Sequence, residues 1–389
     1  MFRLSEFLDT LYTGHIHRPR RPPRAPAVIW NIVRRCNLHC RHCYSGSADH
    51  DFPGELDTRQ ALAVIDDLAE LGVPALILSG GEPLLRADLF TLAARAKAHG
   101  LYLGLSSNGT LVDEAQAERI AAAGFDYVGI SIDGLAARHD RLRGRPGAFE
   151  AALAGLVRLK ARGVKVGLRF TLTRENAADL PGVLHLLDVH ALDKFYLSHL
   201  NFGGRGWRNR DIAAHHRLTR QALTLLFERA WDERRRGIRR HYVTGNNDAD
   251  GVFLLHWAAR RAPKHLEALH AHLRAWGGNA SGVGIANIDN LGHVHPDSFW
   301  WDHRLGNVKE RPFSAIWRDE RDPLLAALRR RPRPLEGRCA ACRYRELCNG
   351  NTRVRARRST GNTWAADPGC YLTDREIGLT PLREPAPCA

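Results

Sequence analysis

Apolar, β-branched runs alternate along the first half of the chain with longer stretches whose apolar residues recur every three or four positions. The runs cover 27–33, 75–79, 102–106, 127–132, 165–173 and 194–200. Helical patterns fill the gaps, from the stripe Leu62, Ile65, Leu68 and Leu71 to stretches at 87–100, 112–123, 147–162 and 176–190. Glycines stand where three of these helices would stop, at Gly100, Gly124 and Gly163.

A repeated βα unit builds a parallel sheet with right-handed crossovers. Eight units would close a barrel, so six predict an α/β fold with an open or partial (β/α)6 barrel of the TIM type. In such folds the active site lies at the carboxyl ends of the strands.

The pattern changes after residue 205, and 389 residues exceed one small domain of about 100–200 residues. We expect a long basic helix over 214–236, then a weaker region over 241–300 with loop-like breaks at Gly245–Gly251 and Gly277–Gly284. The expected parts are an N-terminal extension (1–26), a barrel core (27–205), a helical linking region that covers the substrate (206–300) and a cysteine-rich domain (301–389).

Composition is that of a soluble globular protein, with 44% hydrophobic and 25% charged residues. No apolar run approaches the ~18–20 residues of a membrane span. The N-terminus lacks the order of a signal peptide. We therefore expect a cytoplasmic protein, in which thiols stay reduced and clustered cysteines bind metal rather than form disulfides.

The formal net charge of +15 raises the question of an anionic partner. Basic residues cluster at 17–24, 234–240, 329–333 and 353–358. They could form a solvated surface, or they could meet nucleic acid or a substrate with several carboxylates. Because the clusters are scattered and no nucleic-acid motif surrounds them, we expect no nucleic-acid partner and no membrane partner.

The eight cysteines fall into two groups with none between Cys43 and Cys339. A triad comprises Cys36, Cys40 and Cys43. A tetrad comprises Cys339, Cys342, Cys348 and Cys370, and Cys388 is expected to be an exposed spare.

Three cysteines suit a 4Fe–4S cube with one iron left open for a substrate or cofactor. Zinc is the alternative, with His39 or His42 as a fourth ligand. A structural zinc site normally pairs two knuckles across a loop, whereas this triad stands alone after the first strand.

The triad spacing is C-x3-C-x2-C, and Tyr44 follows the third cysteine. "SGGEP" (79–83), "SSNGT" (106–110) and "SIDG" (131–134) follow the next three strands in order. Together these motifs resemble radical S-adenosylmethionine (SAM) enzymes over about residues 27–200. The resemblance implies a 4Fe–4S cluster on the triad whose open iron binds SAM, and reductive cleavage of SAM to methionine and a 5′-deoxyadenosyl radical.

The same resemblance implies the residues that contact SAM. Gly80, Gly81 and Glu82 would hold its amino group, and Tyr44 would lie beside the cluster. Asn108, Ser131 and Asp133 could bind ribose or carboxylate. Arg143 could meet the carboxylate, or could instead form a surface ion pair.

The tetrad reads C-x2-C-x5-C-x21-C and resembles the SPASM/twitch auxiliary-cluster module. That module usually carries seven cysteines, but Thr352 stands where the next one would fall, and "GHVHPDSFWWDHRLGNVKERPFSAIW" contains none. We therefore expect one auxiliary 4Fe–4S cluster with four ligands, with zinc as the alternative.

The stretches "VIWNIVRRCNLHCRHCYSGS", "GRCAACRYRELCNGNTRVRA" and "DPGCYLTDREIG" resemble the NirJ family, the radical SAM proteins of heme d1 biosynthesis. This resemblance implies removal of propionate side chains from the anionic tetrapyrrole 12,18-didecarboxysiroheme. It also implies a reductase, flavodoxin or ferredoxin as electron donor.

Other functions stay open. A related enzyme of the alternative heme pathway, or a peptide-maturing enzyme, could carry the same modules. About 26 residues precede the first strand, which we expect to be too few for a leader-peptide domain. A cluster-bearing scaffold would not explain GGEP together with an open triad.

Candidate substrate contacts follow from an iron-containing polycarboxylate. Arg205, Arg208 and Arg210 could hold carboxylates. The iron could take an axial ligand from His199, His293 or His295. Trp300 and Trp301 could stack on the macrocycle or pack in the core.

Overall fold

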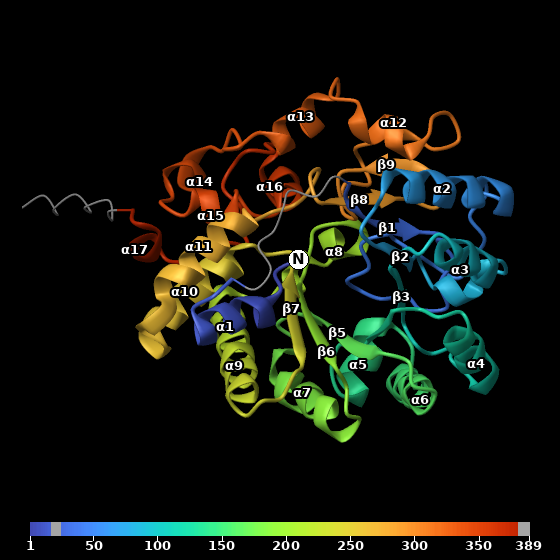
Figure 1. Cartoon of the computed structure of the whole chain (residues 1–389), viewed down its shortest axis with the longest axis horizontal. Coiled ribbons are helices and arrows are strands. Elements are labelled where there is room, and N and C mark those ends of the chain that lie inside the picture. Colours follow the sequence, from blue (N-terminus) through green and yellow to red (C-terminus); the bar gives the residue numbers. More distant parts are fainter. Residues whose placement is uncertain (17–24, 380–389) are drawn as a thin grey trace, which may run out of the picture.

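One sheet organises the computed structural model, which describes residues 1–16 and 25–379 (Figure 1). Within those residues ten strands pair in the order β10-β9-β8-β1-β2-β3-β4-β5-β6-β7. Their bounds are β1 Ala27–Asn31, β2 Leu76–Ser79, β3 Leu103–Ser107, β4 Tyr127–Ser131, β5 Val166–Leu172, β6 Lys194–His199, β7 His241–Gly245, β8 Ile285–Ile288, β9 His293–His295 and β10 Gly306–Asn307. Neighbours from β8 to β7 are parallel, whereas β9 and β10 add on antiparallel.

The expected α/β partial barrel is confirmed, and all six expected strands are present within one or two residues. β7 and β8 extend it at either edge, inside the region that the sequence pattern left weak. β8 consists of four residues, too few for an alternation to stand out. The expected break at Gly245–Gly251 is shorter than predicted because a helix begins at Ala249.

Helices cover the outer face of the parallel strands (Figure 1). Those of the barrel are α2 Thr58–Leu71, α3 Leu89–Ala98, α4 Glu114–Ala122, α5 Ala136–Arg143, α6 Ala148–Ala161, α7 Leu180–Val189, α8 Gly204–Arg208 and α9 His216–Arg235. The expected basic helix is therefore α9. The three glycines expected at helix ends, Gly100, Gly124 and Gly163, have φ of +71°, +68° and +73°, which suits a residue without Cβ.

The remaining helices gather beside the end of the barrel and beyond it. They are α1 Leu4–Thr13, α10 Ala249–Arg261, α11 Leu266–Trp276, α12 Phe313–Arg318, α13 Pro323–Arg329, α14 Gly337–Ala341, α15 Arg345–Cys348, α16 Arg353–Thr360 and α17 Asp374–Ile377. None of the helices in the described ranges combines the length and the apolar character that a membrane span requires. Cys388 and the basic cluster 17–24 lie outside the described residues.

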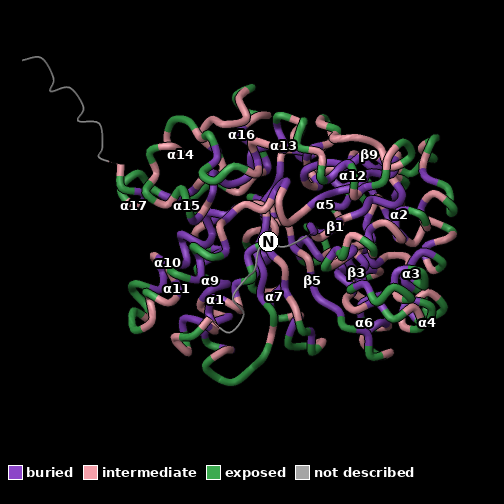
Figure 2. The backbone as a smooth tube through the Cα atoms, turned by 45° about the horizontal axis from the view of Figure 1, so that its top comes forward, coloured by how far each residue is buried: buried purple, intermediate pink, exposed green. Residues whose placement is uncertain are grey.

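The core lies between the sheet and its helices rather than inside the barrel. Outward-facing strand residues such as Val28, Leu78, Ile130 and Leu168 are 0% exposed. In Figure 2 buried backbone fills the interior of the molecule and exposed segments follow its periphery. One hydrophobic cluster extends from Phe2 to Ile377, so the four expected parts share a core, and their boundaries stay a prediction.

The inner face of the sheet is polar and half-buried, unlike the filled interior of a closed barrel. Half-buried residues alternate with fully buried ones along β5 and β6. The half-buried residues are Arg169, Thr171, Lys194, Tyr196 and Ser198. Arg169 Nη1 donates to Ser106 Oγ across Gly129 at 2.7 Å. Solvent therefore reaches the inner face, where a closed barrel would pack layers of aliphatic side chains.

Candidate functional site

The cysteine triad lies on the loop that follows β1, and other elements hold this loop at the carboxyl rim of the barrel. The amides of His39 and Arg41 donate to carbonyls at the end of α5, and the amide of Arg205 donates to the Cys43 carbonyl at 2.8 Å. The Arg205 side chain donates to the carbonyls of Cys40 and Ser47, at 2.7 Å each. Arg205, expected as a possible substrate contact, thus braces the triad loop.

The two glycines of the GGEP motif allow the backbone after β2 to approach the triad loop. The Gly81 amide donates to the Val33 carbonyl at 2.7 Å, and the Glu82 amide donates to the Arg35 carbonyl at 2.9 Å. A Cβ on Gly81 would lie 2.1 Å from the Arg35 oxygen, and one on Gly80 would lie 2.4 Å from the Val33 oxygen. The motif therefore sets the distance between Glu82 and the residue that precedes Cys36.

Gly81→Ala is therefore expected to displace the triad loop. Because the clash involves backbone atoms, we expect destabilisation of at least about 1–3 kcal/mol, together with lower iron content after reconstitution. Gly72→Ala is the control, since a Cβ there meets nothing within 4 Å and only its φ of +76° is unfavourable. Equal iron content in the Gly81→Ala variant and the wild type would contradict this account.

Glu82 is a fully buried carboxylate that has hydrogen-bond donors but no ion-pair partner among the described residues. Its oxygens accept from Leu84 N (3.2 Å), Ser107 Oγ (2.9 Å) and Asn108 N (2.8 Å). Burial nevertheless raises the pKa of Glu82 to about 7. A cationic ligand group such as an amine would offset that cost, so Glu82 fits the amino group of SAM.

Asn108 links the end of β3 to the triad loop. Its Nδ2 donates to Asn37 Oδ1 at 2.9 Å and lies 3.9 Å from Cys36 Sγ, and its Oδ1 accepts from the Thr110 hydroxyl at 2.7 Å. The structure thus brings Glu82 and Asn108 together beside Cys36. The side-chain oxygen of Asn108 is already satisfied within the protein.

Arg143 lies between the triad and Asp133, and is buried rather than at the surface. Its Nη1 is 3.7 Å from Cys40 Sγ and its Nη2 is 2.5 Å from Asp133 Oδ2. Asp133 Oδ2 also pairs with His42 Nε2 at 3.0 Å, and Oδ1 accepts from Thr171 N at 2.6 Å. The alternative of a surface ion pair for Arg143 is wrong, since this pair is internal.

Neighbouring residues stabilise the ionised form of Asp133. Burial alone would raise its pKa, but Arg143 and His42 outweigh burial and hold the pKa below its usual range. The adjacent His139 has a pKa lowered to about 4 by burial and by Arg143, so it is neutral. Asp133 therefore orients Arg143 and His42, while Ser131 remains half-buried on the inner face beside Arg169.

The triad thiols suit a metal cluster. Burial, followed by the neighbouring Cys40, raises the pKa of Cys36 to about 12, so a thiolate there needs cationic iron to form. Among the described residues no three His, Cys, Asp or Glu side chains are arranged to hold a single metal ion. A 4Fe–4S cube spreads its thiolates over separate irons, so the donor set fits a cluster better than zinc.

Aromatic side chains lie beside the triad at the rim. The Tyr44 hydroxyl accepts from Asn31 Nδ2 at 2.9 Å, and the Tyr44 ring contacts Phe299 and Trp301 edge-on at centroid distances of 5.3 and 6.4 Å. Trp301 also stacks on His295 at 6.1 Å. Trp300 is 0% exposed and packs with Leu324, Leu328 and Val354, so its stacking role is wrong and its core role is confirmed.

The three candidate histidines occupy different settings. His199 turns to the outer face, where its Nε2 lies 3.0 Å from Asp250 on α10. His295 is fully buried with both ring nitrogens near acceptors. His293 has a half-buried ring whose Nδ1 lies 3.1 Å from Asp289. Of the candidate arginines, Arg208 and Arg210 are exposed on the surface of this region, and Arg210 lies over the Trp207 ring.

The cysteine tetrad converges on one small cavity in the C-terminal region. Its lining includes all four thiols together with Arg338 and Arg345. Arg338 Nη1 donates to Cys370 Sγ at 3.3 Å, and the Tyr344 amide donates to Cys342 Sγ at 3.4 Å. Burial raises the pKa of Cys348 well above that of a free thiol. Four half-buried cysteines that line one cavity together with two arginines fit a fully ligated iron–sulfur cluster.

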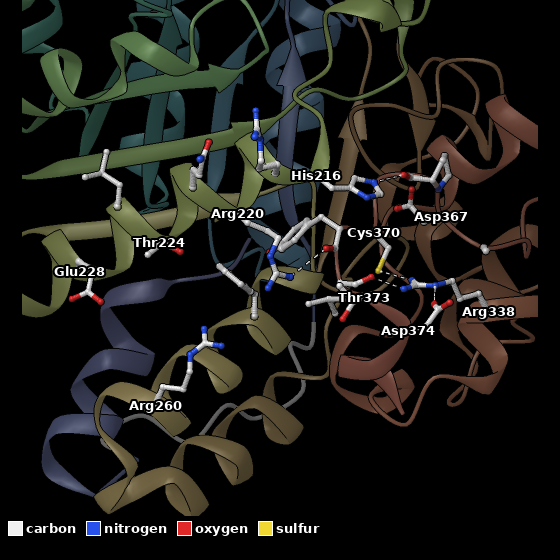
Figure 3. Close-up of a pocket in the computed structure, with 18 residues that line it drawn as sticks. His216, Arg220, Thr224, Glu228, Arg260, Arg338, Asp367, Cys370, Thr373 and Asp374 are labelled. Atoms are coloured by element: carbon white, nitrogen blue, oxygen red, sulfur yellow. Dashed lines mark hydrogen bonds and ion pairs between the residues drawn. The ribbon is translucent and has the colours of Figure 1, made fainter. Parts of the chain in front are cut away.

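A larger cavity of about 1190 Å³ lies outside the barrel, where α9 and α10 meet the C-terminal segment (Figure 3). Arg220, Arg260, His216 and Cys370 are among its lining residues. Arg220 is bound by Glu376 at 2.8 and 2.9 Å. Cys370 and Arg338 line both this cavity and the one that holds the tetrad. The auxiliary site thus borders solvent at Cys370.

Sequence reasoning missed several residues of the inner face and of the rim, among them Arg169, Asp289 and Arg34. The available signal for Arg169 was its position as a polar residue inside the strand sequence "VGLRFTL". Arg34 has no motif, but its guanidinium lies 4.6 Å from the Phe52 ring and 5.5 Å from the Trp301 ring.

Comparisons with known proteins agree with the fold and with the motifs. The model of the radical SAM superfamily matches residues 30–187. The Pre-heme d1 synthase of Dinoroseobacter shibae is 56% identical over 97% of this chain and 94% of its own length. The Fe-coproporphyrin III synthase of Methanosarcina barkeri is 42% identical over 91% of this chain and 90% of its own. This chain belongs to the radical SAM superfamily, whose members bind a 4Fe–4S cluster and SAM.

Solved structures share the architecture at low identity. Streptococcus suis SuiB bound to the precursor peptide SuiA superposes with a TM-score of 0.71, at 14% identity, over 90% of this chain and 77% of that one. Native anSMEcpe with bound AdoMet and Cp18Cys peptide superposes with a TM-score of 0.67, at 18% identity, over 91% of this chain and 99% of that one. These likenesses establish the radical SAM fold alone.

Proposed function

We propose that this enzyme acts in heme d1 biosynthesis and removes propionate side chains from 12,18-didecarboxysiroheme. The observation that carries the proposal is the 56% identity with a Pre-heme d1 synthase over 97% of the chain. The net charge of +15 and the polar inner face agree with a polycarboxylate substrate.

The residues at the rim would have different roles in cofactor binding. Cys36, Cys40 and Cys43 would hold the first cluster, and Glu82 would bind the amino group of SAM. When bound, these cofactors supply a 5′-deoxyadenosyl radical that abstracts a hydrogen atom from a propionate side chain. Arg143 would keep positive charge beside Cys40, while Asp133 fixes the position of Arg143.

The test is anaerobic incubation of reconstituted enzyme with dithionite, SAM and 12,18-didecarboxysiroheme, followed by mass spectrometry. We expect 5′-deoxyadenosine and a tetrapyrrole lighter by its propionate side chains. Deoxyadenosine with an unchanged tetrapyrrole would overturn the substrate and leave the radical SAM chemistry intact.

A second candidate is an alternative-heme-pathway reaction, favoured by the 42% identity with an Fe-coproporphyrin III synthase. The product of the same incubation separates the two candidates. Loss of propionate side chains would favour the first, whereas formation of Fe-coproporphyrin III, which keeps its four propionates, would favour the second. A peptide substrate has weaker support, from the PqqA peptide cyclase of Gluconobacter oxydans at 28% identity and from the fold shared with SuiB at 14% identity.

The auxiliary cluster is part of the proposal. Cys339, Cys342, Cys348 and Cys370 would ligate a second 4Fe–4S cluster, and Thr352 does not join them because its hydroxyl donates to the Asn246 carbonyl at 3.1 Å. Iron–sulfur clusters of this kind and reduced thiols fit a cytoplasmic location, which we propose for this enzyme.

Cys342→Ala should lower iron from about eight to about four per chain and leave the first cluster in place. Iron analysis with electron paramagnetic resonance of the reduced protein measures both. Unchanged iron, or stoichiometric zinc in the wild type, would contradict an auxiliary iron–sulfur cluster.

We further propose that the electron donor is an acidic flavodoxin or ferredoxin that docks at the cavity of Figure 3. Arg217 and Arg260 line this cavity and form no ion pair with a described residue, so they can meet carboxylates of a partner. The apolar part of the lining includes Leu225, which is 38% exposed. Because Cys370 lies at the cavity wall, the auxiliary cluster would be within electron-transfer distance of a donor bound there. One electron would pass from the donor to the cluster.

The double variant Arg217→Glu and Arg260→Glu should slow reduction of the enzyme by reduced flavodoxin about tenfold or more at low salt, because charge complementarity governs such encounters. Stopped-flow absorbance measures the rate, and the difference should shrink as salt rises. Arg318→Glu on α12 is the control, an exposed arginine remote from the cavity. Equal slowing by both changes would count against this docking site.

A further inference from the structure

The inner face of the sheet carries a histidine whose environment suits a metal ligand. His293 begins β9, and Asp289 follows β8, so the two residues face each other across the turn that joins these strands. In the register of these strands Asn287 faces His295, and Asn287 Nδ2 donates to Asn31 Oδ1 at 2.7 Å on the inner face. Since side chains two residues apart share a face, His293 lies on the inner face too.

Asp289 determines which nitrogen of His293 is available. The Asp289 carboxylate accepts from the amides of Leu291 and His293 at 2.9 Å each, and its Oδ2 is 3.1 Å from His293 Nδ1. His295 Nε2 lies 3.3 Å from the same oxygen. Because this carboxylate is the acceptor for both backbone amides, it also accepts from Nδ1 of His293, and Nε2 keeps its lone pair.

This arrangement is the carboxylate–histidine pair that commonly orients metal-binding imidazoles. The His293 side chain is 16% exposed, and no hydrogen bond or ion pair within the described residues occupies its Nε2. His295 cannot serve in the same way, because its Nδ1 faces the His303 carbonyl at 2.7 Å and its Nε2 faces Asp289. His199 faces α10 on the outside of the sheet.

The surroundings of His293 suit a flat, anionic ligand. The His293 ring lies 6.4 Å from the buried His295 ring, on which the half-buried Trp301 stacks. Trp301 in turn contacts Tyr44, next to Cys43. Arg34 lies over Trp301 and has no carboxylate partner among the described residues. An aromatic surface with a cation at its edge can take a macrocycle that bears carboxylates.

We propose that His293 Nε2 is the axial ligand of the iron in the tetrapyrrole substrate, with Asp289 as its positioning residue. This assignment rests on the proposed function, since it requires an iron tetrapyrrole. Ligation through His293 would hold the macrocycle at the rim beside the triad and would discriminate an iron-containing substrate from a metal-free one.

The test compares two ligands with the cluster-loaded enzyme under anaerobic conditions, 12,18-didecarboxysiroheme and its metal-free counterpart. Absorption and electron paramagnetic resonance spectra report the ligation of the substrate iron. His293→Ala should lose the imidazole-ligated spectrum and bind the iron form at least about tenfold more weakly. Its affinity for the metal-free form should match that of the wild type, which also shows that the variant is folded. Added imidazole should restore the ligated spectrum.

Two further variants sharpen the test. His50→Ala changes an exposed histidine whose ring packs on Phe52 at the same rim, and it should leave the spectrum unchanged. Asp289→Asn should retain ligation with weaker binding, about 10–100-fold, as loss of an orienting carboxylate does at metal sites.

The outcomes separate this assignment from the proposed function. An imidazole-ligated spectrum that persists in His293→Ala, or that disappears in His50→Ala instead, overturns the assignment and leaves the function standing. If the wild type binds neither tetrapyrrole, the proposed function fails and the assignment fails with it.

Discussion

Cys40→Ala is expected to produce no detectable 5′-deoxyadenosine from SAM. Cys40 is the central thiol of the triad, it is only 7% exposed, and its sulfur lies 3.7 Å from Arg143. Two remaining thiols cannot hold a cube that needs three protein ligands and leaves one iron for SAM. Liquid chromatography of the quenched reaction measures deoxyadenosine directly.

The matched control is Cys388→Ala, which removes a cysteine that belongs to neither group and lies outside the described residues. It should cleave SAM at the wild-type rate. Normal cleavage by Cys40→Ala would show that the triad is not the SAM-binding site, whereas loss in both variants would point to general damage by cysteine replacement.

Asp133→Asn is expected to destabilise the folded enzyme by about 3–5 kcal/mol, because it leaves the buried Arg143 without its counter-charge. The amide would also lose the attraction to His42 while still able to accept from Thr171 N. Anaerobic urea unfolding of the cluster-loaded protein measures the change. Asp211→Asn, which removes an exposed partner of Arg174, should alter stability little.

The pH dependence of this contribution has a definite sign. The pKa of Asp133 is depressed in the folded protein, since Arg143 and His42 outweigh burial. Its stabilisation is therefore complete above the unfolded pKa of about 3.9 and is lost only as pH falls through the lower folded value. The Asp133→Asn difference should thus be constant from pH 5 upward within about 0.5 kcal/mol. A difference that vanished near neutral pH would contradict the ion pair.

Much of the fold was predictable because each βα unit carries its own local signal. The six strands and the helices between them follow from short-range periodicity, and glycines mark three of the helix ends. β8 was not predictable in this way. Its four residues join the barrel through pairing with β1, and that pairing has no local sequence signature.

In the candidate site, too, some residues could be predicted from local sequence motifs, whereas others depend on contacts between distant parts of the chain. The triad and Glu82 come from motifs in which spacing itself reports the chemistry. Motif reasoning assigned Asp133 to the cofactor, whereas the structure shows its carboxylate held by Arg143, His42 and Thr171. Those partners lie on helix α5, on the triad loop and on strand β5, and only the fold brings them together.

The pairing of β8 with β1 also has a consequence for how the chain folds during synthesis. Ala27 pairs with Ile285, so the strand that precedes the triad keeps one unpaired edge until the distant β8 leaves the ribosome. Translation at about 5–20 residues per second makes this interval on the order of tens of seconds. Contacts between such distant residues also slow folding. The nascent barrel therefore presents a strand edge that can template aggregation until β8 has paired with β1.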